Sequence, residues 1–299
     1  MGATVASETF EKLRNAIERN MKGAPSDPES MRKGMELTAM PLPDGVSGTA
    51  VTAGGVPCEW QVPDGAQDAA VILYVHGGGY VAGSIASHRN LTGHLAKQSG
   101  KRVLSVDYRL APEHPHPAPV DDAVAAYSWL LDQGIDAADI AISGDSAGGG
   151  LTVATQLAIR DRGLPMPAAS VPISPWVDMT ASGESYETRA ELDPMVSHGN
   201  IADIAGHFLG PDGDPADPLA SPINGDLAGL PPMLIQVGDH EVLLSDSEAL
   251  AAKAEADGVD VTLAVWPEMI HVWHTLAGMC DEADEGIAEA AAFINSHLG

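Results

Sequence analysis

The strongest constraint on the fold of this chain is a series of short, continuously apolar runs separated by helical stretches. A strand with one face in water alternates apolar and polar residues, whereas unbroken runs predict strands that are covered on both faces. Strands alternating with helices predict a mostly parallel sheet with helices on both sides, the α/β class. The predicted strands are 70–75, 102–108, 139–143, 169–174, 233–237 and 261–266, and the predicted helices are 86–99, 119–133, 147–162, 245–257 and 282–298.

Three segments depart from this alternation. Residues 7–21 predict an amphipathic helix, and residues 34–62 hold short alternating runs that predict antiparallel strands at the sheet edge, among them Met35-Glu36-Leu37-Thr38. Residues 178–230 are rich in Asp, Pro, Gly and Ser, yet they keep an apolar stripe at helical spacing. This stripe, which predicts an ordered insertion over the sheet, consists of Ile201, Ile204, Phe208 and Leu209.

The charge of the chain excludes several kinds of partner. Its 299 residues include 42 acidic and 15 basic side chains, for a formal net charge of −27. Nucleic acids and anionic lipid surfaces both need Lys and Arg clusters, so neither is an expected partner. No apolar run is long enough to span a bilayer, and the N-terminus lacks the apolar region of a signal peptide, so we expect a cytoplasmic protein. The acidity itself fits either plain solubility or adaptation to salt.

The two cysteines predict neither a disulfide-stabilised fold nor a metal site. Cys58 and Cys280 are far apart in the sequence, and two cysteines make neither a disulfide framework nor the spacing of a zinc site. We therefore expect two reduced thiols, and neither a metal nor a cofactor.

One glycine-rich segment contains a candidate nucleophile. Gly144-Asp145-Ser146-Ala147-Gly148 is a G-x-S-x-G pattern between the strand predicted at 139–143 and the helix that follows. That context is typical of a nucleophile elbow, a strained turn that exposes the serine Oγ. Glycines beside Ser146 let the strand and the helix approach closely, and the N-terminus of the helix favours developing negative charge. The alternative is a glycine-rich turn without chemistry.

A second segment fits the same chemistry. His76-Gly77-Gly78-Gly79 directly follows the strand predicted at 70–75. Glycines after a strand also cradle phosphates, but this segment lacks the Lys-Ser/Thr of a Walker motif and the G-x-G-x-x-G pattern. The HGGG pattern is typical of lipases and esterases, in which backbone N–H groups stabilise the oxyanion of acyl transfer. Ala147, the residue after the candidate nucleophile, would supply a further N–H.

A serine nucleophile of this kind also needs a histidine base and an acid, which follow it in the order acid, then histidine. His271 lies in the loop after the last predicted strand and is the predicted base, while His274 is the weaker candidate. The acid, which orients the imidazole and stabilises its charged form, should follow the strand at 233–237. Three carboxylates compete there: Asp239, Glu241 and Asp246.

Together these motifs resemble those of the hormone-sensitive-lipase-like esterases, the bacterial family IV branch of the α/β-hydrolase fold. The matching segments are His76-Gly77-Gly78-Gly79, Tyr108-Arg109-Leu110-Ala111-Pro112-Glu113, Gly144-Asp145-Ser146-Ala147-Gly148-Gly149, Ser174-Pro175-Trp176-Val177-Asp178, Gly229-Leu230-Pro231-Pro232 and Ile270-His271. The resemblance implies a twisted, mostly parallel sheet with helices on both faces and a helical cap. It also implies an oxyanion hole made by Gly78, Gly79 and Ala147.

The resemblance narrows the choice of acid. Many members of the family have Asp-Pro-Leu at the acid position, and the equivalent residue here is Glu241, which lies 271 − 241 = 30 positions before the histidine. Asp239 lies 271 − 239 = 32 positions before it and stays the alternative. Asp246 is then expected to cap the helix that starts near Ser245.

The domain organisation is also implied by the resemblance. Residues 46–299 would form the catalytic domain, and the cap would combine residues 1–45 with an insertion at about 179–222. Aromatic and aliphatic side chains of this cap would shape the acyl pocket. The alternative for each of them is an ordinary core residue that lines no pocket. The candidates are Tyr186, Met195, Ile204 and Phe208.

The predicted function is a serine carboxylesterase with a triad of Ser146, Glu241 and His271, whose partner is a small-molecule ester. An aromatic content of 4% and the lack of a broad apolar lid favour short- to medium-chain acyl groups. The alternatives are an amidase or other acyl hydrolase on the same triad and, in another class, a non-catalytic ligand-binding homologue. The resemblance also allows a homodimer that pairs through the edge strand near 261–266, since members of the family often pair there, and a monomer is the alternative.

Overall fold

The computed structural model describes residues 6–22, 25–66 and 70–298, so positions 1–5 and 23–24 of the expected cap segment lie outside the described residues. Within this part of the chain, strands form one eight-stranded sheet in the order β1-β2-β4-β3-β5-β6-β7-β8. The strands are β1 Val46–Ala53, β2 Val56–Pro63, β3 Val71–Val75, β4 Arg102–Val106, β5 Ile140–Asp145, β6 Ala169–Ile173, β7 Met233–Gly238 and β8 Val261–Trp266. The helices are α1 Glu8–Met21, α2 Pro28–Leu37, α3 Ile85–Ser99, α4 Ala118–Asp132, α5 Ala147–Asp161, α6 Ser185–Thr188, α7 His198–Leu209, α8 Leu244–Ala256 and α9 Asp281–His297.

The sheet is mostly parallel. β1 pairs antiparallel with β2, and β2 pairs antiparallel with β4, whereas β4, β3, β5, β6, β7 and β8 run parallel to one another. In the centre, Leu73 of β3 lies opposite Leu104 of β4 on one side and Ile142 of β5 on the other. The six apolar runs of the sequence therefore form the six parallel strands, which confirms the predicted α/β class.

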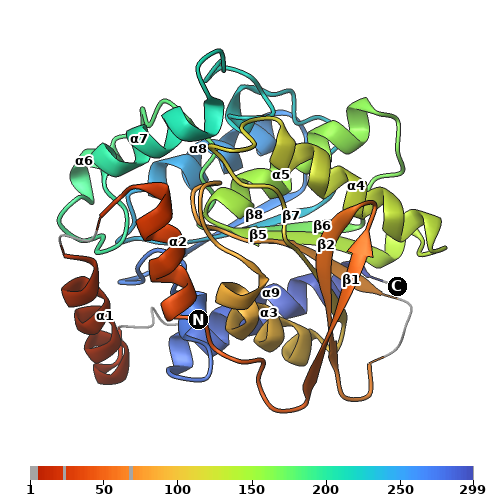
Figure 1. Cartoon of the computed structure of the whole chain (residues 1–299), viewed down its shortest axis with the longest axis horizontal. Helices are drawn as coiled ribbons and strands as arrows, with labels where there is room; N and C mark the ends of the chain where they lie inside the picture. Colours follow the sequence, from red (N-terminus) through yellow and green to blue (C-terminus); the bar gives the residue numbers. More distant parts are fainter. Residues whose placement is uncertain (1–5, 23–24, 67–69, 299) are drawn as a thin grey trace.

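Helices cover both faces of the sheet (Figure 1). Alternate side chains of β3 point to opposite faces, because the side-chain period of a strand is two residues. Leu73 and Val75 belong to the core beneath α4 and α5, while Ile72 and Tyr74 belong to the core beneath α3 and α9. All four side chains are completely buried, which explains why the run has no polar position.

One predicted element differs from the structure. Residues 35–38 resemble a short strand in the sequence, but Met35, Glu36 and Leu37 form the end of helix α2. The Asp27 side chain caps this helix by accepting a hydrogen bond from the backbone N–H of Ser30, and Pro28 occupies its first turn. These start signals outweigh a short alternating pattern. The antiparallel strands begin only at Val46.

Two segments that are distant in the sequence lie at the same end of the molecule. Helices α1 and α2 and helices α6 and α7 gather on the left of Figure 1, apart from the helices that cover the sheet. Arg32 of α2 donates hydrogen bonds to the carbonyls of Val81 and Ala111 and forms an ion pair with Glu113. Through these contacts, α2 is anchored to the segments that follow β3 and β4.

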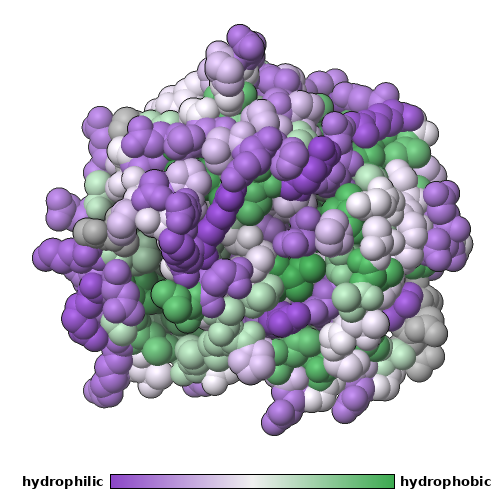
Figure 2. Space-filling view, viewed as in Figure 1, coloured by the Kyte–Doolittle hydropathy of each residue, from purple (hydrophilic) through white to green (hydrophobic). Residues whose placement is uncertain are grey.

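The face of the molecule drawn in Figure 2 mixes polar and apolar residues. Hydrophilic side chains gather along its left and top, and apolar patches lie between them in the centre and the lower part. In the part of the chain that the structure describes, no helix is both long enough and apolar enough to cross a membrane.

Candidate active site

The candidate site residues lie at the carboxyl ends of parallel strands. His76 follows β3, Ser146 follows β5 and Glu241 lies just after β7, while His271 lies in the loop after β8. Because these strands are parallel neighbours in one sheet, their carboxyl ends share one edge, where open α/β sheets bind their ligands. Residues that are far apart in the sequence are brought together there.

Ser146 lies in a strained turn between β5 and α5. Its backbone has φ 55° and ψ −121°, a conformation that non-glycine residues rarely adopt. The turn is held by the Ser146 N–H, which donates to the Ile173 carbonyl at 2.8 Å. A Cβ on Gly148 would lie 2.0 Å from the carbonyl oxygen of Val75, so only glycine fits where α5 approaches β3. This is the geometry of a nucleophile elbow.

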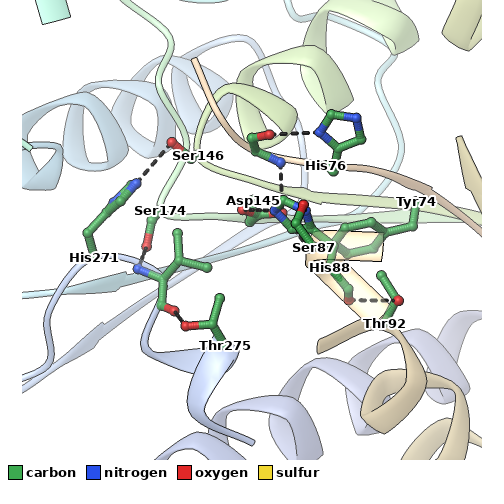
Figure 3. A network of polar contacts seen from close by, with 12 residues as sticks. Tyr74, His76, Ser87, His88, Thr92, Asp145, Ser146, Ser174, His271 and Thr275 are labelled. Atoms are coloured by element: carbon green, nitrogen blue, oxygen red, sulfur yellow. Dashed lines mark hydrogen bonds and ion pairs between the residues drawn. The ribbon is translucent and has the colours of Figure 1, made fainter. Parts of the chain in front are cut away.

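A chain of hydrogen bonds joins Ser146, His271 and Glu241. The Ser146 hydroxyl lies 2.9 Å from Nε2 of His271. Figure 3 shows the His271 imidazole pointing toward Ser146. On the other side of the ring, Nδ1 lies 2.8 Å from Oε2 of Glu241. A carboxylate only accepts hydrogen bonds, so Nδ1 carries the proton and Nε2 is left free to accept the proton of the hydroxyl.

The surroundings of His271 favour its charged form. The imidazole is 5% exposed and the Glu241 side chain is fully buried. Burial alone would lower the pKa of His271, but the hydrogen bond and the charge of Glu241 outweigh it, and the pKa is raised above 6.5. The charged form of His271, the imidazolium, is therefore stabilised by Glu241.

Glu241 is itself held by two further hydrogen bonds. Its Oε1 accepts from the backbone N–H of Gly238 and from the Ser174 hydroxyl, both at 2.7 Å. The Ser174 oxygen also accepts from the N–H of Val272 at 3.2 Å, so one serine links the acid to the residue after His271. This role of Ser174 is not predicted from the sequence, although the Ser174–Asp178 segment is among the motifs that match the family.

Asp239 has a different function. Its Oδ1 accepts the backbone N–H of Glu268 at 2.6 Å, and its carbonyl accepts from Arg189 at 2.7 Å. Glu268 has a positive φ of 62°, in the loop that leads to His271. Asp239 thus stabilises the turn that presents the histidine, while Glu241 contacts the imidazole.

The expectation that Asp246 caps a helix is wrong. Helix α8 begins at Leu244 and has no side-chain cap. Asp246 instead accepts the backbone N–H groups of Val177 and Asp178, each at 3.0 Å. Its side chain thereby connects α8 to the segment after β6, which is more than sixty positions away in the sequence. The residue preferences at helix starts are local, so they give no sign of such a distant partner.

His274, the weaker candidate for the base, is part of the core. It lies in the short 3-10 helix Trp273–Leu276, and its Nε2 contacts the side-chain oxygen of Gln236 at 3.1 Å. Burial lowers its pKa to about 3, so it stays neutral.

The glycine segment after β3 offers backbone donors beside Ser146. Gly78 has φ 110°, and a Cβ at this position would lie 2.3 Å from the Ala82 carbonyl oxygen. His76 Nδ1 lies 2.7 Å from the Gly77 carbonyl oxygen. Because a trans peptide is planar with its C=O and N–H pointing in opposite directions, this contact also sets the direction of the Gly78 N–H. Ala147 starts helix α5, so its N–H has no partner within the helix.

The four candidate pocket residues occupy different places. Phe208 of α7 stacks on Tyr80 at a centroid distance of 3.8 Å, and Tyr186 is also almost completely buried. Met195 packs at the edge of a cluster around Phe10. Ile204 reaches the glycine segment, since a Cβ on Gly79 would lie 2.7 Å from its Cγ2. Of these four side chains, Ile204 is thus the one in contact with the predicted oxyanion hole.

The described residues contain no group of three or more His, Cys, Asp or Glu side chains arranged to hold a metal ion. Both cysteines are free and buried, as expected. The groups that the structure brings together at the site are a hydroxyl, an imidazole and a carboxylate.

Comparison with known proteins identifies close relatives. Residues 72–275 match the family described as alpha/beta hydrolase fold. An acetyl-hydrolase from Streptomyces hygroscopicus is 42% identical over 99% of both chains. A crystal structure of an esterase from the bacterial hormone-sensitive lipase family superposes with a TM-score of 0.95 at 46% identity, covering 99% of this chain and all of the other. A crystal structure of EstE5 soaked with p-nitrophenyl butyrate gives a TM-score of 0.94 at 47% identity, covering 98% and 99%.

Proposed function

Since this chain belongs to the alpha/beta-hydrolase family, among the ester hydrolases related to bacterial hormone-sensitive lipase, we propose that it is a serine carboxylesterase that acts through an acyl-enzyme intermediate. The observation that carries this proposal is the hydrogen-bond chain from Ser146 through His271 to Glu241. A serine, a histidine and a carboxylate in this order are recognised by their geometry as the groups of nucleophilic acyl transfer.

In the first half of the reaction, the Ser146 Oγ attacks the ester carbonyl carbon while His271 Nε2 takes its proton. The carbonyl oxygen becomes an oxyanion, which the N–H groups of Gly78, Gly79 and Ala147 stabilise. The intermediate then collapses to an acyl-enzyme, and the alcohol leaves with the proton from His271. Throughout, Glu241 accepts a hydrogen bond from the Nδ1–H of His271 and stabilises the imidazolium.

In the second half, water takes the place of the alcohol. His271 removes a proton from the water as it attacks the acyl carbonyl, and the same backbone N–H groups stabilise the second oxyanion. When this intermediate collapses, the proton returns to the Ser146 Oγ and the carboxylic acid is released. The cycle uses only groups of the chain and one water molecule.

Covalent labelling tests the serine mechanism. A fluorophosphonate is expected to modify the folded protein stoichiometrically, with the added mass on the peptide that contains Ser146, because only an activated serine attacks phosphorus at a useful rate. Protein unfolded before the reagent is added serves as the control and should stay unlabelled. If the folded protein stays unlabelled as well, the result contradicts the serine mechanism and favours a non-catalytic, ligand-binding protein.

The proposed substrates are neutral esters with short to medium acyl chains. Support comes from the acetyl-hydrolase among the relatives and from the p-nitrophenyl butyrate used with EstE5. The proposed cap, made of α1–α2 and α6–α7, also limits the space over the glycine segment, since Ile204 reaches Gly79.

A chain-length series measures this preference. We expect kcat/KM for p-nitrophenyl acetate and butyrate to exceed that for the dodecanoate by at least about tenfold, since each poorly accommodated methylene costs part of the binding energy. Faster hydrolysis of an emulsified long-chain triglyceride than of these short esters would contradict the assignment.

A further inference from the structure

Behind the glycine segment lies a buried pair of charged side chains that the triad does not use. Asp145 Oδ1 accepts the Gly77 N–H at 3.0 Å and the Tyr74 hydroxyl at 2.7 Å. Its other oxygen, Oδ2, lies 3.4 Å from Nε2 of His88, and both side chains are at most 4% exposed. Figure 3 shows Asp145 close to His88 and Tyr74, with His271 on the other side of the view.

The contacts of the two ring nitrogens determine the protonation state of His88. Nε2 faces the Asp145 carboxylate, which only accepts. Nδ1 lies 3.2 Å from the Ser84 carbonyl oxygen and 2.9 Å from the Ser87 hydroxyl oxygen. The Ser87 hydroxyl donates its own proton to the Ser84 carbonyl, so it too accepts from the ring. Both nitrogens therefore face acceptors, and only the imidazolium has a proton for each of them.

The charges around the pair agree with this geometry. Burial alone would lower the pKa of His88, but Asp145 and the Ser84 carbonyl outweigh it and raise the pKa above 6.5. Burial would raise the pKa of Asp145, yet His88 and Tyr74 bring it down to about 2. Among the other titratable groups, His76 is neutral because burial and the His88 charge lower its pKa to about 3, and Glu36 favours the charged His88 imidazole. The Asp145 charge also acts on Tyr74 and Tyr108, and it favours the charged forms of His271 and His274.

We propose that His88 is a charged imidazolium in the resting enzyme that keeps Asp145 ionised, and that the pair positions the backbone donors of the oxyanion hole. The role in catalysis rests on the proposed esterase function, whereas the charge state of His88 does not. An ionised carboxylate accepts a shorter and stronger hydrogen bond than a neutral one. Ionised Asp145 thus holds the Gly77 N–H, while His76 holds the Gly77 carbonyl.

The His88 imidazolium also compensates the negative charge of Asp145, which lies close to the reacting groups. Asp145 directly precedes Ser146, so an uncompensated carboxylate there would oppose the negative charge that develops on the substrate oxygen. A buried charge that loses its partner is costly as well, because the desolvation of the remaining ion is no longer compensated. Both effects predict that removal of His88 alone is worse than removal of both charges.

Nitrogen NMR of the resting enzyme tests the charge state without any substrate. In protein labelled with ¹⁵N-histidine, the signals of His88, assigned by their loss in His88→Gln, are expected to show two protonated nitrogens at pH 7. In Asp145→Asn the same ring should become neutral at this pH. A wild-type His88 with one unprotonated nitrogen at pH 7 would overturn the proposal, whatever the enzyme turns out to hydrolyse.

A double-mutant cycle tests the role in catalysis. His88→Gln is expected to lower kcat by about 100-fold with little change in KM, the loss typical of a disturbed oxyanion hole. Adding Asp145→Asn, which keeps the acceptor for the Gly77 N–H, should recover part of that loss. If the double variant is as slow as or slower than His88→Gln, the pair does not act through its charges. Fluorophosphonate labelling of Ser146 in each variant separates this failure from a failure of the proposed function.

Discussion

Replacement of Ser146 by alanine is expected to lower kcat for p-nitrophenyl butyrate by about a million-fold, with KM changed only a few-fold. Alanine removes the atom that attacks the carbonyl carbon, so no acyl-enzyme forms, while the oxyanion donors and the substrate pocket stay in place. The residual rate should still exceed that in water by about a thousandfold, because backbone N–H groups and substrate binding act without the nucleophile.

Ser146→Gly is the matched control for this experiment. It should be equally inactive, but it relieves the strain at φ 55° and is expected to stabilise the fold by about 1 kcal/mol relative to the alanine variant, measured by thermal or urea unfolding. Two folded, inactive variants that differ in stability in this direction would show that the elbow is strained in order to present the serine. Retention of more than about one per cent of the activity by either variant would exclude Ser146 as the nucleophile.

The parallel sheet could be predicted because its sequence signal is local. The run Val71–Val75 is buried on both faces, so every position in it had to be apolar, and the same holds for Ile140, Ala141 and Ile142 of β5. Helix α2 was missed for the opposite reason. None of its residues is fully buried, and only Met31 and Met35 pack against the core, so its apolar stripe is too short for a helical period to be recognised.

The candidate site was predictable as far as its residues occur in short motifs. The segments around Ser146 and Gly78 and the loop of His271 each have a pattern of their own, and strand order explains why they meet. The supporting contacts have no such pattern. Ser174 and Glu241 are 67 positions apart, and the partners of Asp145 and Asp246 are equally distant, so only the packed fold brings them together.

The identity of the triad acid can be decided by two conservative substitutions. Glu241→Gln is expected to lower kcat by about ten-thousandfold, because a neutral amide neither stabilises the imidazolium nor keeps the proton on Nδ1 of His271. Asp239→Asn should cost less than about tenfold, since the side-chain oxygen of asparagine still accepts the Glu268 N–H. The two variants remove one negative charge each from neighbouring positions, so they are matched controls for each other.

The pH dependence separates the same two roles. Catalysis needs neutral His271, so kcat/KM should fall as the pH drops through the His271 pKa, which Glu241 raises above 6.5. Removal of the Glu241 charge lowers this pKa, and the acid limb should therefore move to lower pH in Glu241→Gln. In Asp239→Asn it should stay where it is. Near-normal activity of Glu241→Gln together with collapse of Asp239→Asn would reverse the assignment and make the hydrogen bond between Glu241 and His271 a purely structural contact.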